Sequence, residues 1–348
     1  MASQPGRAYL NRIGTAVPDF DVHEGYVAYA REALGDTRLR RHFERLLSRA
    51  QIDHRYAVVP VDYYGGTLPD TATRMRDYEE RALALAERAV EALGVERVRG
   101  ATHLIVTTCT GFYAPGIDVQ LVARFGLDPG IERTIVGFMG CYAAVSALKL
   151  ARHIVRSDAR ARVLVVNLEV CSLHLQRPES IEQALGFSIF ADGCAASLVS
   201  AEPAGLALDS FSSTLIPESV DEITWRIGTL GFDMRLSLDV PRKIAAALLR
   251  DPLGVLGGIA PGDVDVWAVH PGGRAVLDAV QDALGIAHDA LGNSRDVLRS
   301  FGNMSSATIV FVLERVLARA RAAREAAGCA LAFGPGMICE TMRFSVVP

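Results

Sequence analysis

The chain has 348 residues, of which 50% are hydrophobic and 22% are charged, with a formal net charge of −4. This length allows two domains, or two halves that share one core, and the composition excludes a disordered chain. The slightly acidic balance argues against a nucleic-acid partner, because a general nucleic-acid-binding protein needs a basic face.

Helices and buried strands alternate along the first half of the chain. Leucine and alanine recur at helical spacing over 37–50 and 71–93. An apolar run then predicts a strand over 101–108, followed by a helix over 116–125, a strand over 134–138, a helix over 142–155 and a strand over 162–167. Such alternation predicts an α/β fold with a mostly parallel sheet covered by helices on both faces.

The second half continues the pattern after a stretch of strands and loops over 205–240. We expect a helix after Pro241, a strand over 265–269, helices over 273–284 and 304–327, and final strands over 330–333 and 342–346. Each half also places a glycine and a polar residue before a helix that leads to a buried strand, as Gly140-Cys141 and Gly302-Asn303. This repeated order favours two similar halves that contribute to one site.

Cys141 lies where a short apolar strand ends in glycine and a helix begins, within VGFMGCYAA. The positive end of the helix dipole favours a thiolate at such a position, so the context indicates a nucleophile. The alternative is a buried thiol in a packed turn, which is usual for cysteine in a reducing compartment. The six cysteines contain no C-x-x-C pair, which argues against a zinc site.

His270 ends the apolar run VWAVH and precedes Pro271 and two glycines. Ligand and catalytic groups of α/β sheets gather at the carboxyl ends of strands, although a histidine there also commonly satisfies backbone groups. Asn303, within FGNMSSA, is either the N-cap of the following helix or a carboxamide donor for a developing oxyanion. These two roles of Asn303 are compatible.

Other sequence signals bear on cofactors and location. The chain has no Walker loop, no G-x-G-x-x-G, no G-x-S-x-G and no H-E-x-x-H motif. The arginine-rich run 38–49 is either a solvated helix face or a phosphate-binding site. The turn Gly334-Pro335-Gly336 leads into a strand, so it is a rigid turn beside a cavity rather than a phosphate loop. Since no apolar stretch reaches the ~20 residues of a membrane helix and the N-terminus has no signal-like apolar region, we expect a cytoplasmic protein.

Four motifs resemble those of the type III polyketide synthases, the chalcone synthase family. They are GCYAA at Cys141, HPGG at His270, GNMSSA at Asn303 and AFGPGM-x-x-ET over 332–341. In addition, FADG at Phe190 is similar to the family's F-G-D-G. The resemblance extends over nearly the whole chain, and TGFYAPG and VNLEVCSLHLQ look most like bacterial members that make alkylresorcinols or alkylpyrones.

The resemblance implies a thiolase-like fold of αβαβα layers, with one half over 1–204 that carries the cysteine and one over 205–348 that carries the histidine and asparagine. It also implies a homodimer. Cys141 would hold an acyl group from a fatty acyl-CoA starter, while His270 and Asn303 would stabilise the enolate formed when malonyl-CoA loses CO₂. This chemistry requires no metal or redox cofactor.

The resemblance also assigns substrate-binding positions. Phe190 corresponds to the gatekeeper between CoA tunnel and cavity, and Met234 replaces a second phenylalanine there. The cavity wall carries Cys109 in place of threonine and Trp225 in place of glycine, and Trp225 favours a resorcinol product. The remaining positions are Ala114, where plant enzymes reach into the partner's cavity, Arg45 and Arg49 (with His42), which would face CoA phosphates, and Gly334 and Pro335 in the turn beside the cavity.

Three other functions remain open from the residues alone. A ketosynthase that initiates fatty-acid synthesis would use the same triad but stop after one condensation with carrier-bound malonate. A cysteine hydrolase or simple acyltransferase would use Cys141 and His270, with Asn303 orienting the histidine. An inactive binding relative would keep the fold without the chemistry.

Overall fold

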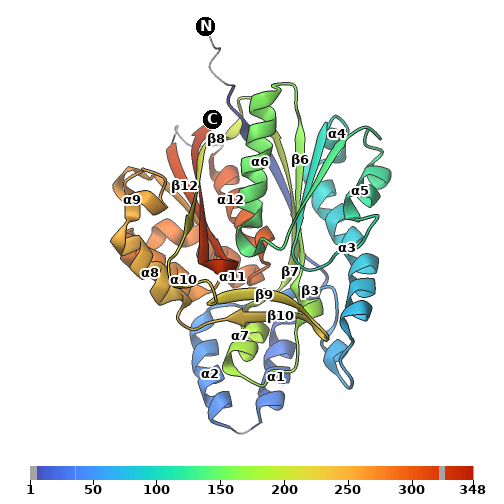
Figure 1. Ribbon diagram of the computed structural model, residues 1–348, viewed down its shortest axis with the longest axis vertical. Helices are drawn as coiled ribbons and strands as arrows, with labels where there is room; N and C mark the ends of the chain where they lie inside the picture. The colour runs from blue at the N-terminus through green and yellow to red at the C-terminus, as the bar shows by residue number, and fades with distance from the viewer. Residues whose placement is uncertain (1–5, 36, 321–325, 348) are drawn as a thin grey trace.

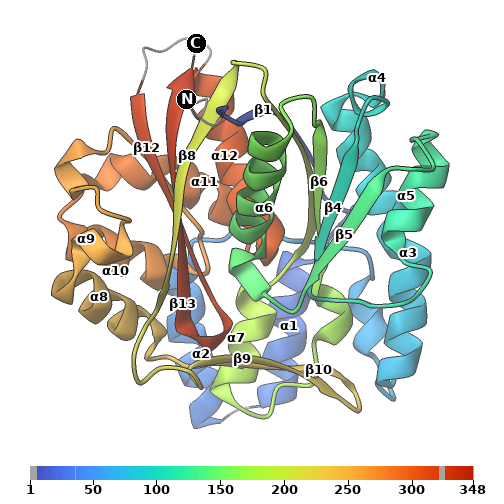
Figure 2. The same cartoon turned by 45° about the horizontal axis from the view of Figure 1, so that its top comes forward.

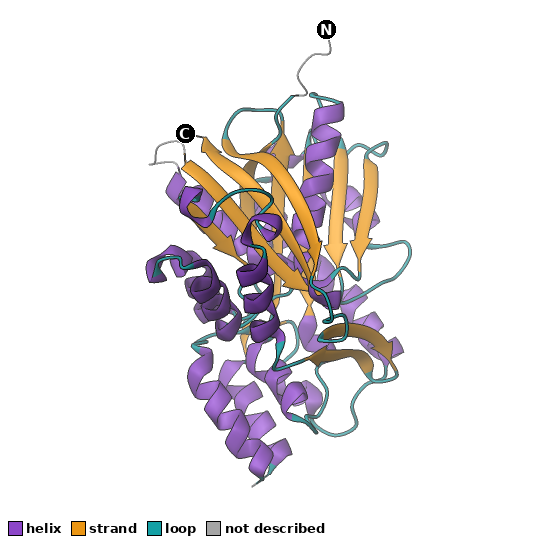
Figure 3. Ribbon diagram, turned by 60° about the vertical axis from the view of Figure 1, so that its left-hand side comes forward, coloured by secondary structure: helices purple, strands orange, loops and turns teal. Residues whose placement is uncertain are grey.

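The structure is a computed structural model that describes residues 6–35, 37–320 and 326–347. Its main sheet has nine strands, in the order β11 (Val266–Val269), β12 (Ala326–Gly334), β13 (Ile338–Val347), β8 (Gly205–Leu215), β1 (Tyr9–Ala16), β7 (Asp192–Ser200), β6 (Val163–Val170), β4 (His103–Thr108) and β5 (Glu132–Gly137). Two small sheets pair β9 (Ile223–Gly228) with β10 (Gly231–Leu236) and β2 (Phe20–Asp21) with β3 (Tyr56–Ala57). Figure 3 shows the β9–β10 hairpin as a separate pair of strands beyond the end of the main sheet.

Helices connect most of these strands. They are α1 (His23–Leu34), α2 (Arg38–Ala50), α3 (Thr71–Leu93), α4 (Val95–Val98), α5 (Ile117–Phe125), α6 (Ala143–Ser157), α7 (Ile181–Ile189), α8 (Val240–Arg250), α9 (Pro252–Val255), α10 (Arg274–Leu284), α11 (Gly292–Phe301) and α12 (Ser306–Ala320). Short 3₁₀ turns include η2 (Gly140–Tyr142), η3 (Cys171–His174) and η6 (Pro335–Met337). Within the described ranges, none of these helices combines the length and apolarity that crossing a bilayer requires.

The order of pairing in the main sheet repeats between the two halves of the chain. In the N-terminal half, β4 pairs with β6 in parallel, and β6–β7 and β7–β1 are antiparallel. In the C-terminal half, β11 pairs with β12 in parallel, and β12–β13 and β13–β8 are antiparallel. The two sets meet where β1 pairs with β8. The predicted duplication is therefore confirmed at the level of topology, with α6 and α12 in equivalent places.

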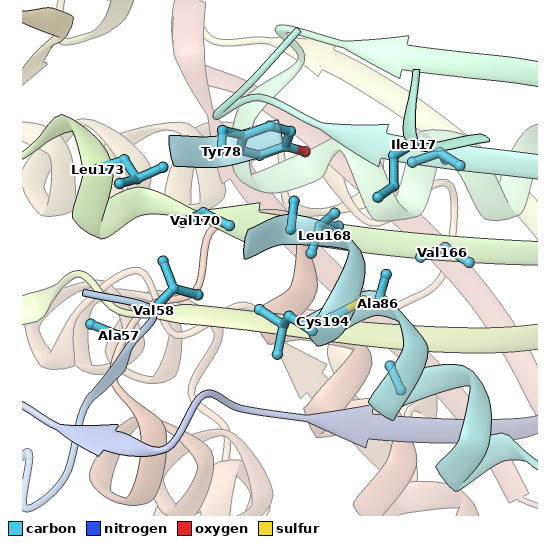
Figure 4. Close-up of a cluster of buried hydrophobic side chains, with 14 of the residues drawn as sticks. Ala57, Val58, Tyr78, Ala86, Ile117, Val166, Leu168, Val170, Leu173 and Cys194 are labelled. Atoms are coloured by element: carbon cyan, nitrogen blue, oxygen red, sulfur yellow. The ribbon is translucent and has the colours of Figure 1, made fainter. Parts of the chain in front are cut away.

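The layers of helices on either side of the main sheet follow because its strands are buried on both faces. In β6, Leu164 and Val166 pack on the outer side against α3 and α5, whereas Val163 and Val165 face the central helices. Figure 4 shows the outer cluster, in which Tyr78 of α3 and Ile117 of α5 approach β6. Strands buried on both faces need apolar residues at every position, which explains their continuous hydrophobic runs.

The central layer consists of α6 and α12, which contact each other inside the curve of the sheet (Figures 1 and 2). The outer faces are covered by α3 and α5 on the N-terminal side and by α8 and α10 on the C-terminal side. This gives the αβαβα arrangement that the resemblance implied. It also brings the N-terminal ends of α6 and α12 together from opposite halves.

Three sequence-based expectations about the elements were wrong or incomplete. The sheet is mixed rather than mostly parallel, because only β11–β12, β6–β4 and β4–β5 are parallel. The helix expected over 304–327 begins at Ser306, and Ala326 and Ala327 belong to β12; residues 321–325 lie outside the described part. Helices α1, α7 and α11 and strand β7 were not predicted.

Candidate active site

The turn that presents Cys141 is held by close backbone packing. Cys141 lies in η2, and α6 begins two residues later at Ala143. Gly140 has a φ of 72°, and a Cβ on it would lie 2.2 Å from Pro335 Cδ. Only glycine fits both this left-handed conformation and this contact. Gly334 packs from the other side, where a Cβ would lie 3.2 Å from the Cys141 nitrogen.

Cys141 differs from the other cysteines in exposure. It is partly exposed to the cavity, whereas Cys109, Cys171, Cys194, Cys329 and Cys339 are buried. Its Sγ lies 3.8 Å from Ser305 Oγ. Burial nevertheless raises the pKa of the Cys141 thiol to about 12, which is opposite to the direction that the helix start predicts. At neutral pH the group is therefore a thiol, and it needs a base to become a nucleophile.

His270 lines the same cavity as Cys141 and is the candidate for that base. It follows β11, is 1% exposed, and its main-chain nitrogen donates to Leu331 O (2.8 Å). Neither Nδ1 nor Nε2 has a hydrogen-bond partner among the described residues, and burial lowers the pKa of His270 to about 3. The ring is thus an unprotonated imidazole at neutral pH, and both nitrogens are available to a ligand.

Asn303 is fixed by its own surroundings in one orientation. Its Oδ1 accepts the Ser305 main-chain N–H (2.9 Å), and its Nδ2 donates to Gly272 O (3.2 Å). A carboxamide nitrogen has two N–H donors, so one of them remains for a substrate. Asn303 also holds the turn before α12, but the helix begins at Ser306, so Asn303 lies two residues before the N-cap position and the expected N-cap role is wrong.

These three side chains line one cavity. An apolar part of its wall comes from α7, α8, α10 and β10, with Gly186, Met234, Leu236, Val240, Ile244 and Val276. The described lining contains the carboxylates Glu182 and Asp233 and no lysine or arginine. Such a cavity suits an acyl chain rather than a phosphate. The described residues also contain no cluster of three or more His, Cys, Asp or Glu side chains that fits a metal ion.

An aromatic wall closes another part of the cavity. Trp225 Nε1 donates to Cys109 O (2.7 Å), and the ring of His174 stacks on Phe232 with centroids 4.1 Å apart. His174 Nε2 lies 2.6 Å from Thr110 O, and its Nδ1 accepts the Phe232 N–H (3.0 Å). With both nitrogens engaged and its pKa lowered to about 3 by burial, His174 is a neutral structural group that holds the wall in place.

A buried carboxylate behind the site was not predicted from sequence. Glu169 Oε1 accepts Ser306 Oγ–H (2.5 Å), and Oε2 accepts Cys109 N–H and Thr110 Oγ–H, both at 3.0 Å. It therefore ties the end of β4 to the start of α12. Burial raises its pKa to about 7. The sequence did carry a signal for it, because Glu169 is a charged residue inside a run that otherwise suits a fully buried strand. A charged residue is rarely buried in this way without a partner.

The structure brings together most, but not all, of the expected site residues. Cys109, Phe190, Trp225, Met234 and Pro335 line the cavity with the triad. Gly334, Ala114, Arg45 and Arg49 do not: Gly334 lies behind Cys141, and the other three are exposed on the surface of the chain. Any contact these residues make with substrate must involve a group outside this cavity or a second subunit.

Comparison with known sequences identifies relatives over the whole chain. Residues 1–203 match the N-terminal domain of chalcone and stilbene synthases, and residues 207–348 match their C-terminal domain. The alpha-pyrone synthesis polyketide synthase-like Pks18 of Mycobacterium tuberculosis is 33% identical, over 98% of this chain and 91% of its own length. Bisdemethoxycurcumin synthase of Oryza sativa is 32% identical, over 97% and 92%.

Solved structures agree with these matches. PKS-I from the brown alga Ectocarpus siliculosus has a TM-score of 0.89 at 28% identity, with complete coverage of both chains. The C-terminal type III polyketide synthase domain of Steely1 from Dictyostelium also has a TM-score of 0.89, at 24% identity, over 98% of this chain and 100% of its own. The second likeness shows the shared fold.

Proposed function

Because the chain belongs to the chalcone and stilbene synthase family of type III polyketide synthases, we propose that it extends a long-chain acyl-CoA starter with malonyl-CoA in repeated decarboxylative condensations. The product is an alkylated pyrone or resorcinol. The observation that carries this proposal is the meeting of Cys141, His270 and Asn303 in one largely apolar cavity that contains no cationic side chain.

Loading of the starter follows from the protonation states. The Cys141 thiol transfers its proton to the unprotonated His270 imidazole as sulfur attacks the thioester carbonyl. The thioester bond to CoA breaks, the leaving thiolate takes the proton, and the acyl group stays on Cys141. Because the proton moves between two groups of the same cavity, the step creates no net charge in a buried site.

Condensation uses the free donors of the other two residues. The thioester carbonyl of malonyl-CoA accepts hydrogen bonds from His270 and from the unused N–H of Asn303. When CO₂ leaves, negative charge develops on that oxygen, where the fixed donors stabilise it most. The enolate carbon then attacks the Cys141 thioester, and the thiolate is released for the next round.

The geometry disfavours a cysteine hydrolase. In that mechanism Asn303 would orient the histidine by a hydrogen bond to its ring. Instead, the polar atoms of Asn303 are directed to Ser305 N, Thr308 Oγ1 and Gly272 O, and the ring nitrogens of His270 have no partner among the described side chains and main chain. A ketosynthase that stops after one condensation differs in the number of extensions, which product analysis measures.

The nucleotide part of CoA fits a basic stripe outside the cavity. Arg38, Arg41, Arg45 and Arg49 are spaced by three, four and four residues, so they follow one face of α2 for about 16 Å. The stripe ends beside the cavity, since Arg274 at the start of α10 donates to Arg49 O (3.3 Å) and α10 contributes Val276 to the lining. We therefore assign Arg45 and Arg49 to the CoA phosphates.

Replacing both Arg45 and Arg49 with alanine should raise the KM for malonyl-CoA and leave kcat unchanged. We expect about a fivefold increase per arginine, since an exposed ion pair contributes at most ~1 kcal/mol. Steady-state kinetics at low ionic strength measure this effect. The KM for an acyl thioester that lacks the nucleotide should not change in the double variant. Arg160→Ala, which removes a distant exposed arginine, is the matched control. Equal KM values for malonyl-CoA in the wild type and the double variant would contradict the assignment of Arg45 and Arg49 to the CoA phosphates.

A homodimer fits the exposed edge of the main sheet. Of the two edge strands, β11 is largely buried, whereas β5 is exposed along most of its length. Ile135 of β5, Val119 and Phe112 form an apolar patch beside it, with exposures of 41%, 41% and 39%. Unpaired edges of this kind favour pairing with another strand. Ala114, in the same loop as Phe112, would then lie close to the partner.

Replacing Ile135 with aspartate should convert the dimer to a monomer, because a buried interface would have to desolvate the new charge. Light scattering coupled to size-exclusion chromatography measures the mass directly. Leu249→Asp is the control: Leu249 is more exposed, at 68%, and belongs to α8, which lies at the opposite end of the main sheet from β5 (Figure 2). A monomeric wild type, or a dimer that survives Ile135→Asp, would contradict this placement.

Product analysis tests the proposed function as a whole. The purified protein is incubated with malonyl-CoA and a series of acyl-CoA starters of increasing chain length, and products are identified by mass spectrometry. We expect ring products that contain the starter and at least two malonyl-derived units. The likeness to an alpha-pyrone synthase favours the pyrone, whereas Trp225 in the cavity wall favours the resorcinol. A single β-keto product would identify a one-step ketosynthase, and free fatty acid alone would identify a hydrolase.

A further inference from the structure

Arg55 is a fully buried arginine beside the site to which neither the sequence analysis nor the mechanism assigns a role. Its side chain is 0% exposed. Nε donates to His23 Nδ1 (3.0 Å), Nη1 donates to Phe190 O (3.1 Å), and the guanidinium lies 5.2 Å from the centre of the Tyr26 ring. Burial lowers the pKa of Arg55 to about 10, so it remains a cation at neutral pH.

This buried charge has no ion-pair partner among the described residues; its acceptors are an imidazole nitrogen and two carbonyl oxygens. Arginine is rarely buried without a carboxylate, because removing the charge from water is costly. A neutral side chain would fill the same space at lower cost. The contacts of Arg55 therefore need an explanation beyond packing.

Arg55 touches both segments that carry the gatekeeper and the carboxamide donor. Its head group holds the Phe190 carbonyl, and its stem packs on Gly302, where a Cβ would lie 2.7 Å from Arg55 Cγ. The same two segments are joined directly, because Asn303 N donates to Ile189 O (2.8 Å) and Ala191 N donates to Asn303 O (2.9 Å). Phe190 belongs to the N-terminal half and Asn303 to the C-terminal half.

The main chain around Arg55 is fixed to the same two halves. Asp53 N donates to Arg299 O (2.8 Å) at the end of α11, four residues before Asn303. Val58 N donates to Asp192 Oδ2 (2.8 Å), two residues after Phe190. The segment 53–58 therefore holds both parts of the site, and the Arg55 side chain contacts both of them, at Gly302 and Phe190.

We infer that Arg55 is a positioning residue that sets the Asn303 carboxamide against the cavity by clamping Gly302 and the Phe190 carbonyl together. This inference rests on the proposed function, because the reaction that it affects is the decarboxylation of malonyl-CoA. The loading of Cys141 depends on η2 and His270, and within the described part of the chain Arg55 donates its hydrogen bonds to His23 and Phe190 instead. Loss of Arg55 should therefore slow the decarboxylation of malonyl-CoA and leave the loading of Cys141 nearly unchanged.

The test measures the two half-reactions separately. Decarboxylation is followed as acetyl-CoA formed from malonyl-CoA in a Cys141→Ala background, and loading as the rate at which a starter acyl group appears on Cys141 in otherwise wild-type protein. Arg55→Lys keeps the charge but loses the fork that reaches both His23 and Phe190. We expect its decarboxylation kcat to fall by ~10²-fold, the scale of a misplaced catalytic group. Loading should stay within about threefold of wild type.

Arg74→Lys is the matched control. Arg74 is also 0% exposed and donates to carbonyl oxygens of Leu173 and Leu175, but it does not contact the segments of Phe190 or Asn303. Arg74→Lys should lower the melting temperature, and it should not slow decarboxylation more than it slows loading. Gly302→Ala provides an independent variant, because its methyl group would displace Arg55 and Ile189 O, and it should reproduce the selective loss.

Two outcomes would overturn the inference. One is an Arg55→Lys decarboxylation rate equal to that of the Cys141→Ala parent. The other is an equal loss of loading and decarboxylation in Arg55→Lys, as expected for a purely structural arginine. If the Cys141→Ala parent itself does not decarboxylate malonyl-CoA, the proposed function fails instead, so the two failures are distinguishable.

Discussion

Replacing Cys141 with alanine should abolish polyketide formation and leave the decarboxylation of malonyl-CoA measurable. The variant cannot hold the starter as a thioester, so chain growth has no electrophile. Removing a nucleophile that acts with a base costs at least ~10⁴-fold in turnover. Decarboxylation survives because His270 and Asn303 still offer their donors to the developing enolate. Products are measured by mass spectrometry, and CO₂ release by labelled malonyl-CoA.

A cysteine from the core provides the control for this variant. Cys194 is fully buried in β7 and does not line the cavity, so Cys194→Ala should retain chain growth. Cys171 and Cys109 line the cavity and are less suitable for comparison. Polyketide formation by Cys141→Ala would mean that another group carries the acyl chain, and the assignment of the nucleophile would be wrong.

Replacing Asn303 with aspartate should remove decarboxylation without unfolding the turn. Aspartate keeps an oxygen that accepts the Ser305 N–H, which preserves the contact before α12. It loses the N–H donor and places negative charge where the enolate oxygen develops. We expect kcat for decarboxylation to fall by ~10²–10³-fold, the cost of losing one oxyanion donor. Acetyl-CoA formation measures the loss, and the melting temperature checks the fold.

The loading of Cys141 separates this effect from a general loss of structure. Since the His270 ring nitrogens have no hydrogen-bond partner among the described residues, and the Asn303 side chain is only a minor influence on the pKa of Cys141 beside burial, the starter should still acylate Cys141 in Asn303→Asp. Asn11→Ala is a second comparison, because Asn11 joins β1 to Ser200, Glu202 and Ala204 and does not line the cavity. Normal decarboxylation by Asn303→Asp would show that the residue only holds the turn before α12.

The meeting of Cys141, His270 and Asn303 in one cavity could be expected from the sequence, because local patterns mark each of them. Cys141 follows a strand and a glycine, His270 ends a strand, and Asn303 follows a left-handed glycine before a helix. In each case a short stretch of sequence fixes the local geometry. The protonation states were not predictable, because the pKa of Cys141 depends on burial by residues from both halves of the chain.

The strand directions were misjudged for a physical reason. The patterns that indicate a buried strand are the same for parallel and antiparallel pairs when both faces are covered. β7 escaped prediction because DGCAASLVS consists largely of small residues with weak strand preference. α7, in contrast, had a readable start: Ser180 and Gln183 form a capping box in the structure, and the S-x-x-Q spacing was present in the sequence.

Residues that act on another molecule were the least predictable. Arg45, Arg49 and Ala114 were placed by resemblance alone, and in the structure none of them lines the cavity of its own chain. The partners proposed for them are CoA and a second subunit, and a single sequence does not contain either. Arg55 was also not predicted, because its contacts with Phe190 and Gly302 join residues more than a hundred positions away.

The central claim is that one cavity holds the growing chain on Cys141 while His270 and Asn303 generate the attacking enolate. Its most direct test is intact-protein and peptide mass spectrometry of the wild type, first with a long-chain acyl-CoA and then with a single equivalent of malonyl-CoA. The claim predicts acylation of the Cys141 peptide alone, followed by release of that adduct from Cys141 as a β-ketoacyl-CoA one ketide unit longer than the starter, with release of one CO₂. Acylation at another residue, or CO₂ release without conversion of the Cys141 adduct to the extended β-ketoacyl-CoA, would contradict it.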